Sequence, residues 1–156
     1  MVRSFEDFLG VSRPMTDVSS IAVYCGSKAG TSPAYVEAAR ELGRGMVARG
    51  VDLVFGGGRV GIMGEIADTI LEGGGKVTGV IPHFLDELEV SHEKVTELIR
   101  VDNMHIRKAT MFNQADAFVI LPGGLGTLDE FFEVVTWKQL RLHRKPIVVL
   151  NVAGCW

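Results

Sequence analysis

The chain has 156 residues, of which 47% are hydrophobic, and a formal net charge of −3 at pH 7. This length and apolar content predict a single globular domain with a substantial buried core. The 16 Lys and Arg residues are scattered and outnumbered by 19 Asp and Glu residues, so the basic patch typical of nucleic-acid-binding proteins is missing. We therefore expect a small anion, and no nucleic acid, as the partner.

The sequence has no pattern typical of a membrane or secreted protein. Residues 1–20 lack the continuous apolar core of a signal peptide, and no later stretch reaches 18 apolar residues without a charge or a glycine. The two cysteines, Cys25 and Cys155, provide neither a disulfide framework nor a metal-ligand spacing. We expect a soluble, cytoplasmic protein with two free thiols, no metal and no membrane partner.

Short apolar runs alternate with longer helical patterns along the chain. We predict strands at residues 21–25, 52–55, 77–81, 117–121 and 146–150, because each run is short and rich in Val and Ile. We predict helices at residues 33–49, 61–73, 104–114 and 127–142. This alternation is typical of a parallel sheet with helices on both faces, so we expect a Rossmann-like α/β fold. Residues 1–18 are expected to form an arm or short helix, and residues 19–156 the single domain.

Glycine-bearing loops follow three of the predicted strands. They are GSKAGTSP at residues 26–33, GGGRVGIMG at residues 56–64 and PGGLGT at residues 122–127. In a parallel α/β sheet, ligands bind outside the carboxyl ends of the strands. Free backbone N–H groups and the helix dipole favour an anion there, and glycine lets the ligand approach. The three loops therefore predict a phosphate site.

The second of these loops contains a pattern that resembles a dinucleotide-binding fingerprint. Gly56, Gly58 and Gly61 match G-x-G-x-x-G between a predicted strand and a predicted helix. The acid that would bind a ribose hydroxyl about 20 residues later is missing, because the next strand ends in VIP at residues 80–82. An NAD site is thus disfavoured, and tight strand-to-helix packing is the plain alternative for these glycines.

The third loop allows two interpretations. Thr127 and Glu130 fit a capping box, in which Thr caps the N3 amide and Glu reaches back to the N-cap amide. A capping box does not explain the three glycines that precede it. A phosphate on the amides of this helix start, with acids nearby for the hydroxyls of a sugar, would explain them.

The segment DNMHIRK at residues 102–108 places two cations near an expected helix start. With Asp102 or Asn103 as the N-cap, Arg107 and Lys108 lie about one turn into the helix, where cations are unfavourable unless an anion is near. The alternative is a solvated helix face. His105 is expected to be structural.

Together, GGGRVGIMG, MHIRK and PGGLGTLDE resemble the three signature segments of the Lonely Guy (LOG) family, the cytokinin riboside 5′-monophosphate phosphoribohydrolases long labelled as lysine decarboxylases. The similarity extends to VYCGSKAG, GVIPHFLDELE and TWKQLRLHRKPIVVLN, and so covers nearly everything from Ser20 onward. The resemblance implies hydrolysis of the N-glycosidic bond of an N6-substituted adenosine 5′-monophosphate, which releases the free base, a cytokinin, and ribose 5-phosphate. It also implies a homodimer and no cofactor. Family members usually continue past the segment NVAGCW, so a fragment or a short member is expected.

The resemblance further implies which residues form the site. The catalytic pair of the family falls on Arg107 and Glu130. A carboxylate beside the ribose can stabilise an oxocarbenium-like sugar and orient water, which we assign to Glu130. Arg107 is too basic to donate a proton readily, and we assign it to fixed electrostatics. The other substrate contacts fall on Glu89, Lys108, Gly124, Leu125, Gly126, Thr127, Leu128, Asp129 and Thr136, with Gly57 and Gly58 as helpers of the phosphate site.

Alternative functions remain open. One is a general AMP or 5′-nucleotide nucleosidase, and another is a non-catalytic nucleotide or cofactor carrier of the same fold, as in molybdenum-cofactor carrier proteins. The presence of both Arg107 and Glu130 argues against a carrier. An amino-acid decarboxylase is disfavoured, because no segment clearly supplies a Schiff-base lysine with an acid partner for pyridoxal phosphate. Trp137 and Leu142 could support a dimer interface, with core packing as the alternative.

Overall fold

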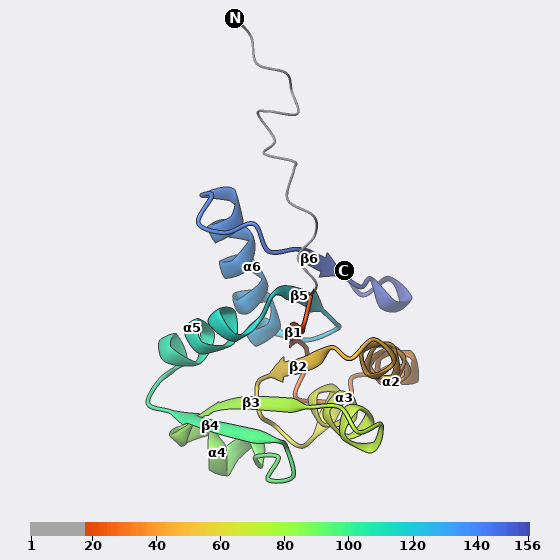
Figure 1. Cartoon of the computed structure of the whole chain (residues 1–156). Coiled ribbons are helices and arrows are strands. Elements are labelled where there is room, and N and C mark those ends of the chain that lie inside the picture. The colour runs from red at the N-terminus through yellow and green to blue at the C-terminus, as the bar shows by residue number, and fades with distance from the viewer. Residues whose placement is uncertain (1–17) are drawn as a thin grey trace, which may run out of the picture.

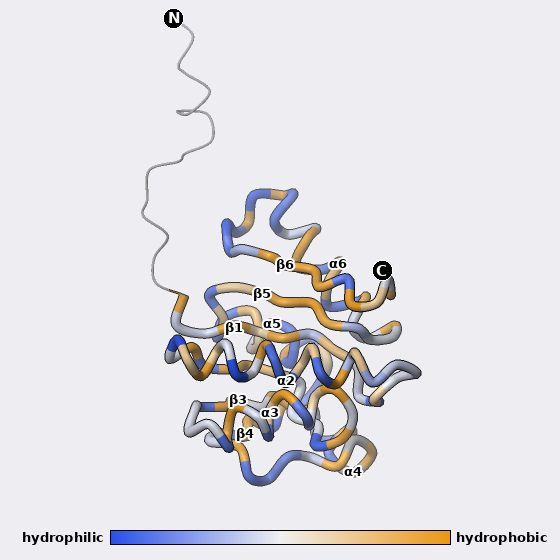
Figure 2. The backbone as a smooth tube through the Cα atoms, turned by 90° about the vertical axis from the view of Figure 1, so that its right-hand side faces the viewer, coloured by the Kyte–Doolittle hydropathy of each residue, from blue (hydrophilic) through white to orange (hydrophobic). Residues whose placement is uncertain are grey.

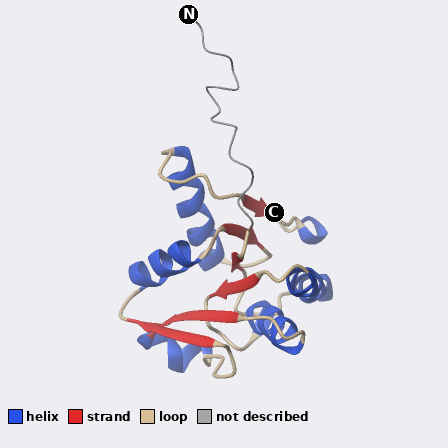
Figure 3. Cartoon of the chain, viewed as in Figure 1, coloured by secondary structure: helices blue, strands red, loops and turns tan. Residues whose placement is uncertain are grey.

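The structure is a computed structural model that describes residues 18–156 (Figures 1 and 3). The expected N-terminal arm lies outside the described residues, apart from Val18. In chain order, the elements are β1 (Ser20–Tyr24), α2 (Pro33–Ala48), β2 (Asp52–Phe55), α3 (Gly61–Glu72), β3 (Val77–Pro82), α4 (His83–Glu89), β4 (Glu97–Val101), α5 (Met104–Gln114), β5 (Ala117–Ile120), α6 (Leu125–Gln139), β6 (Ile147–Val149) and a 3-10 turn, η1 (Val152–Gly154).

The strands form one six-stranded sheet in the order β4-β3-β2-β1-β5-β6, and every neighbouring pair is parallel. In the register of the central strands, Ile21 of β1 lies between Leu53 of β2 and Ala117 of β5. Helices α2 and α3 cover one face, and α5 and α6 cover the other (Figure 1). The Rossmann-like α/β prediction is therefore confirmed.

Each face of the sheet has its own core. Leu53, Phe55 and Ile66 are fully buried on the α2–α3 face, and Phe118 and Met111 are buried on the α5–α6 face. Burying such a side chain contributes about 1.5–3 kcal/mol. Strands covered on both faces need apolar residues at every position, which explains the continuous hydrophobic run of β5 (orange in Figure 2).

Three elements were not predicted: helix α4, strand β4 and the 3-10 turn η1. Helix α4 has only seven residues and no side-chain cap at Pro82. Strand β4 lies at the edge of the sheet, and the charged residues Glu97 and Arg100 interrupt its apolar residues, so it lacks the apolar run of the central strands. The other predicted elements agree with the structure to within three residues at each end.

The order of the strands reverses beside β1, because the chain runs outward from β1 to β4 and then returns to place β5 on the other side of β1. Ligand sites in such sheets lie outside the carboxyl ends of the strands at this switch point. Here the loops after β1 and β5 meet, and the amide of Gly26 donates to the carbonyl of Pro122 at 3.0 Å.

None of the helices in residues 18–156 combines the length and the apolar character that crossing a membrane requires.

Candidate functional site

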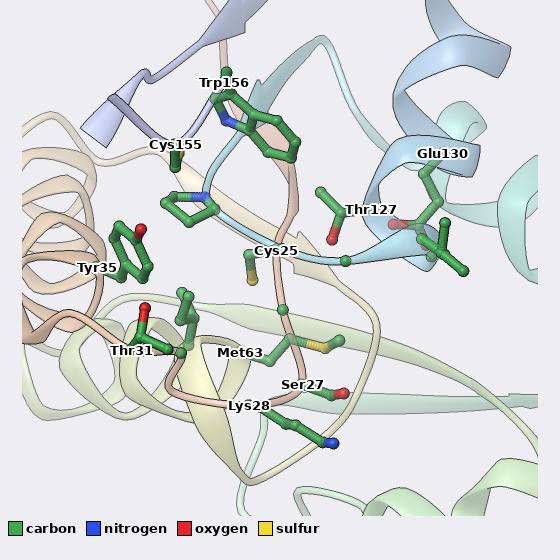
Figure 4. Close-up of a pocket in the computed structure, with 18 of the residues that line it drawn as sticks. Cys25, Ser27, Lys28, Thr31, Tyr35, Met63, Thr127, Glu130, Cys155 and Trp156 are labelled. Atoms are coloured by element: carbon green, nitrogen blue, oxygen red, sulfur yellow. The ribbon is translucent and has the colours of Figure 1, made fainter. Parts of the chain in front are cut away.

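A cavity of about 620 Å³ lies at the switch point between β1 and β5 (Figure 4). Its walls come from five segments that are far apart in the sequence: the loop after β1 with the start of α2, the start of α3, the start of α5, the loop after β5 with the start of α6, and the last two residues. The lining residues are Cys25, Gly26, Ser27, Lys28, Gly30, Thr31, Tyr35, Ile62, Met63, Met104, Arg107, Pro122, Gly123, Gly124, Leu125, Gly126, Thr127, Glu130, Cys155 and Trp156.

Helix α5 directs Arg107 into the cavity wall. The helix begins after Asn103, whose side-chain oxygen accepts from the amide of Ile106 at 2.9 Å, so Asn103 and not Asp102 is the N-cap. Only 4% of Arg107 is exposed. Its Nε donates to the carbonyl of Val80 at 3.0 Å, and its Nη2 donates to the carbonyl of Gly56 at 2.6 Å. Because a guanidinium does not lose its proton, these bonds fix a permanent positive charge at the cavity.

The first glycine of the β2–α3 loop makes room for this guanidinium. A Cβ atom on Gly56 would overlap Nη2 of Arg107 and lie 3.1 Å from Sδ of Met63. Gly57 and Gly58, which were expected to help hold a phosphate, are buried and do not line the cavity. The carbonyl of Gly57 instead accepts from the amide of His92 at 2.9 Å.

The G-x-G-x-x-G pattern of this loop serves close packing. Gly61 has a φ of +68°, and a Cβ there would overlap the backbone between Ser27 and Lys28. Gly64 has no room for a Cβ either, because the carbonyl of Arg59 occupies that place. These contacts agree with the packing alternative for the glycine pattern and not with a dinucleotide site.

Helix α6 starts earlier than the capping box requires. Its N-cap is Gly124, which has extended backbone (φ −104°, ψ −150°) and makes no side-chain cap bond. Thr127 is thus the third residue of the helix and Glu130 lies in the second turn, so the capping-box interpretation is wrong. Thr127 is buried against Gly123, where a Cβ would overlap its Oγ1.

The N-terminus of α6 is open for an anion. The first amides of a helix have no partner within the helix, and here neither a capping side chain nor an acidic residue of the first turn neutralises them. A Cβ on Gly124 or Gly126 would meet no atom within 4 Å, and neither glycine has a positive φ. The fold itself therefore does not require glycine at either position. Close approach of a ligand to the backbone would explain why both residues are glycines.

Glu130 points into the cavity from the same helix, near Thr127 (Figure 4). Burial raises the pKa of the Cys25 thiol, and the negative charge of Glu130 raises it further. Burial and the charges of Glu130 and Glu133 raise the pKa of Tyr24 in the same way. Cys25 therefore stays a neutral thiol at neutral pH and is not a nucleophile.

Lys108, next to Arg107, lies outside the cavity lining. Its Nζ is 2.8 Å from Oε2 of Glu133 and 3.2 Å from Oδ2 of Asp129, and these carboxylates raise its pKa. The anion that Lys108 was expected to need is thus supplied by carboxylates of α6. Arg107 donates to two neutral backbone carbonyls. Lys108 and Asp129 tie α5 to α6.

Two more predicted contacts do not line the cavity. Leu128 is half-buried, and Thr136 is exposed farther along α6. Glu89 is the last residue of α4, and its side chain is not described. Of the predicted residues, the structure brings together Arg107, Glu130, Gly124, Leu125, Gly126 and Thr127.

Several lining residues were not predicted from the sequence. Ser27, Lys28 and Tyr35 come from the first glycine-bearing loop and the helix after it, which the sequence marked as a segment but not residue by residue. Trp156 is held by a hydrogen bond of 2.9 Å from its amide to Oδ1 of Asn151.

In the described part of the chain, no group of three or more His, Cys, Asp or Glu residues could hold a metal ion.

Comparison with known proteins identifies related chains. The family model described as "Possible lysine decarboxylase" matches residues 63–156. Cytokinin riboside 5′-monophosphate phosphoribohydrolase LOG7 of Arabidopsis thaliana is 52% identical over 134 residues, which cover 86% of this chain and 62% of that protein. Cytokinin riboside 5′-monophosphate phosphoribohydrolase LOG of Oryza sativa subsp. japonica is 52% identical over 134 residues, covering 86% of this chain and 55% of that protein. The chain thus spans less than two thirds of the length of these relatives.

Solved structures with the same fold include cofactor carriers. The Moco carrier protein from Chlamydomonas reinhardtii superposes with a TM-score of 0.69 at 26% identity, over 85% of this chain and 75% of that chain. The molybdenum cofactor binding protein from Rippkaea orientalis gives a TM-score of 0.65 at 22% identity, over 83% of this chain and 74% of that chain, and this likeness shows the fold alone.

Proposed function

Because the chain belongs to the LOG family, whose model matches residues 63–156, we propose that it hydrolyses the N-glycosidic bond of N6-substituted adenosine 5′-monophosphate. The products would be the free base, a cytokinin, and ribose 5-phosphate. One observation supports this proposal above the others: Arg107 and Glu130 line the same cavity as the open N-terminus of α6. A relative that is 52% identical is named as a phosphoribohydrolase of cytokinin riboside 5′-monophosphate.

In this proposal the phosphate binds at the start of α6. The amides of Leu125, Gly126 and Thr127 belong to the first turn and have no partner within the helix. The dipole of a 15-residue helix adds positive potential at the same place. Gly124 and Gly126 leave space for phosphate oxygens, since they carry no side chain and a Cβ at either position would meet no atom within 4 Å.

Glu130 acts on the sugar. As the bond from C1′ to the base nitrogen breaks, its electron pair leaves with the base and C1′ becomes positively charged. The carboxylate of Glu130 stabilises that charge and orients a water molecule, whose oxygen bonds to C1′. One proton of this water passes to the carboxylate, and the departing base gains a proton from the solvent.

Arg107 contributes charge and position. Its guanidinium is fixed by the carbonyls of Val80 and Gly56 and faces the cavity, where it holds the phosphate or the ribose of the substrate. Such preorganised charge costs no rearrangement during the reaction.

A product assay tests the proposal. The purified protein is incubated with N6-isopentenyl-AMP, AMP and the two matching ribosides, and chromatography measures free base and ribose 5-phosphate. We expect base from the monophosphates and none from the ribosides, because only the monophosphates can use the start of α6. Equal rates with AMP and N6-isopentenyl-AMP would favour the general 5′-nucleotide nucleosidase.

The likeness to the Chlamydomonas reinhardtii Moco carrier protein supports a second candidate, a nucleotide or cofactor carrier. A carrier would bind the monophosphate in the same cavity and release no base. Calorimetry with AMP, run beside the product assay, separates the two functions: binding with turnover supports the hydrolase, and binding without turnover supports the carrier.

A homodimer is also part of the proposal, together with a cytoplasmic location. Large apolar side chains are exposed on α5, on α6 and just after α6, namely Ile106, Phe132, Leu140 and Leu142. A second copy of the chain would cover them. Trp137 is half-buried and packs edge-on against Phe112, with ring centroids 5.0 Å apart. Sedimentation of the wild type and of Phe132→Glu tests the interface, since the variant should become monomeric.

A further inference from the structure

The loop between β2 and α3 is held by two sets of hydrogen bonds. On the cavity side, the carbonyl of Gly56 accepts from Nη2 of Arg107 at 2.6 Å. Outside the cavity lining, the segment Val90 to His92 pairs with the loop: the amide of Arg59 donates to the carbonyl of Val90 at 3.0 Å, and the amide of His92 donates to the carbonyl of Gly57 at 2.9 Å. The segment Val90 to His92 thus bonds to Gly57 and Arg59, next to the carbonyl of Gly56 that accepts from Arg107.

The paired segment has a backbone that needs support. Val90 has a φ of +51°, in the left-handed region, which is unfavourable for a β-branched residue. Such a conformation persists only where surrounding contacts impose it. Val90 itself is exposed, so its own side chain does not supply that support.

The side chain of His92 supplies the anchor. Only 1% of His92 is exposed, and its ring packs edge-on against Phe55, the last residue of β2, with centroids 6.5 Å apart. Its Nε2 lies 2.9 Å from Oδ1 of Asp68 on α3. Its Nδ1 is buried without a hydrogen-bond partner among the described residues.

We propose that His92 and Asp68 are positioning residues for the reaction: the Asp68–His92 pair fixes the segment Val90 to His92, which fixes the Gly56–Gly57 turn, which holds Arg107 at the cavity. Neither residue lines the cavity. The inference rests on the proposed function for its kinetic test, whereas its structural test is independent of any activity.

The kinetic test uses His92→Phe, which keeps a ring and removes both nitrogens. We expect kcat/KM for the monophosphate to fall about 10- to 100-fold, because small displacements of positioning groups have effects of this size. We also expect KM to rise. A protein that is merely less folded would lose kcat alone and keep its KM, so an unchanged KM would overturn the proposal.

Four further variants separate positioning from general destabilisation. Asp68→Ala should share the effect of His92→Phe, whereas Asp68→Asn retains an oxygen that can accept from Nε2 and should keep most of the activity. Ile70→Val alters a buried residue of the same helix and should leave KM unchanged. On an Arg107→Lys background, His92→Phe should have no further effect, since the residue that it positions is already altered.

Nuclear magnetic resonance tests the same inference without substrate. The Nε–H signal of Arg107, identified by its absence in Arg107→Lys, should exchange slowly with water because this N–H donates to Val80 within the fold. In His92→Phe we expect a shifted signal and faster exchange, and in Ile70→Val neither change. An Arg107 signal that is the same in His92→Phe and the wild type would overturn the inference. A wild type that releases no base would instead refute the proposed function, and this spectrum would still test the positioning.

Discussion

Arg107 and Gly56 form one structural unit: the Nη2 atom of Arg107 donates to the carbonyl of Gly56 at 2.6 Å, and the missing side chain of Gly56 leaves the space that the guanidinium fills. A glycine 51 positions earlier in the chain thereby sets where the cation of the cavity lies. The signature GGGRVGIMG thus acts on the site through Arg107, with only Ile62 and Met63 of that segment reaching the cavity.

Replacing Gly56 by alanine should displace Arg107. The new Cβ would overlap Nη2, and we expect base release from the monophosphate to fall about 100-fold, as for other small misplacements of a positioning group. Gly43→Ala is a matched control, since its Cβ would be crowded at 3.0 Å by Cγ2 of Thr69 in the α2–α3 interface. Steady-state kinetics and thermal melts of both variants give the comparison. Equal loss of activity in the two would mean that crowding alone is responsible.

Glu130→Gln should abolish activity and preserve the fold. Glu130 lies in the second turn of α6 behind the N-cap Gly124, so the substitution removes no capping bond. It removes the charge that would stabilise the sugar cation, and we expect turnover to fall about 100-fold or more. Single-turnover chromatography measures the rate, and circular dichroism checks the fold.

Glu133→Gln is the control for Glu130→Gln. Glu133 lies one turn farther along α6 than Glu130. The Glu133→Gln variant has a weaker interaction with Lys108, and we expect its free energy of unfolding to be lower by about 1 kcal/mol. It should stay active, because Glu133 does not line the cavity. A Glu130→Gln variant as active as Glu133→Gln would remove Glu130 from the mechanism.

Much of the fold could be predicted from the sequence because β1, β2, β3 and β5 are buried on both faces and consist of apolar runs. Strand β4 escaped prediction because an edge strand is partly solvated, and its charged Glu97 and Arg100 hide the pattern. Helix α4 is too short for a clear periodicity.

The site was only partly predictable for a geometric reason. Arg107 and Lys108 are adjacent cations, and the rotation of α5 on the sheet sends the first to the cavity and the second to the carboxylates of α6. No spacing in the sequence encodes that rotation. The capping box failed because the backbone of Gly124 starts the helix early, which places Thr127 inside the first turn.

The thiol of Cys25 should make the protein less stable at alkaline pH. Burial and Glu130 raise its pKa, so above the ordinary value of 9.0 the unfolded chain loses a proton that the folded chain keeps. The unfolded state then binds fewer protons, and the free energy of unfolding falls by roughly 1 kcal/mol per pH unit. Urea titrations at pH 8 and pH 10 under reducing conditions should show this loss in the wild type and in Cys155→Ala. Cys25→Ala should show a smaller loss, and an equal loss would contradict the assignment.

Gly126→Ala should separate the needs of the fold from those of the ligand. A Cβ at this position meets no atom within 4 Å and needs no strained φ. Because alanine favours a helix over glycine, we expect the free energy of unfolding of the variant to equal that of the wild type or to exceed it by up to about 1 kcal/mol. The same Cβ would stand beside the amides proposed for the phosphate, and we expect AMP to bind about tenfold more weakly, a loss of about 1.4 kcal/mol. Gly45→Ala, on α2 with its nearest neighbour at 3.7 Å, is the control that should bind AMP normally.

Calorimetric titration with AMP and thermal melts measure both properties of these variants. Weaker AMP binding together with an unchanged or higher melting temperature in Gly126→Ala would mean that this glycine is required by the ligand. Unimpaired binding would move the phosphate away from the start of α6, toward the remaining polar groups of the cavity on the loop after β1, where Ser27 and Lys28 lie.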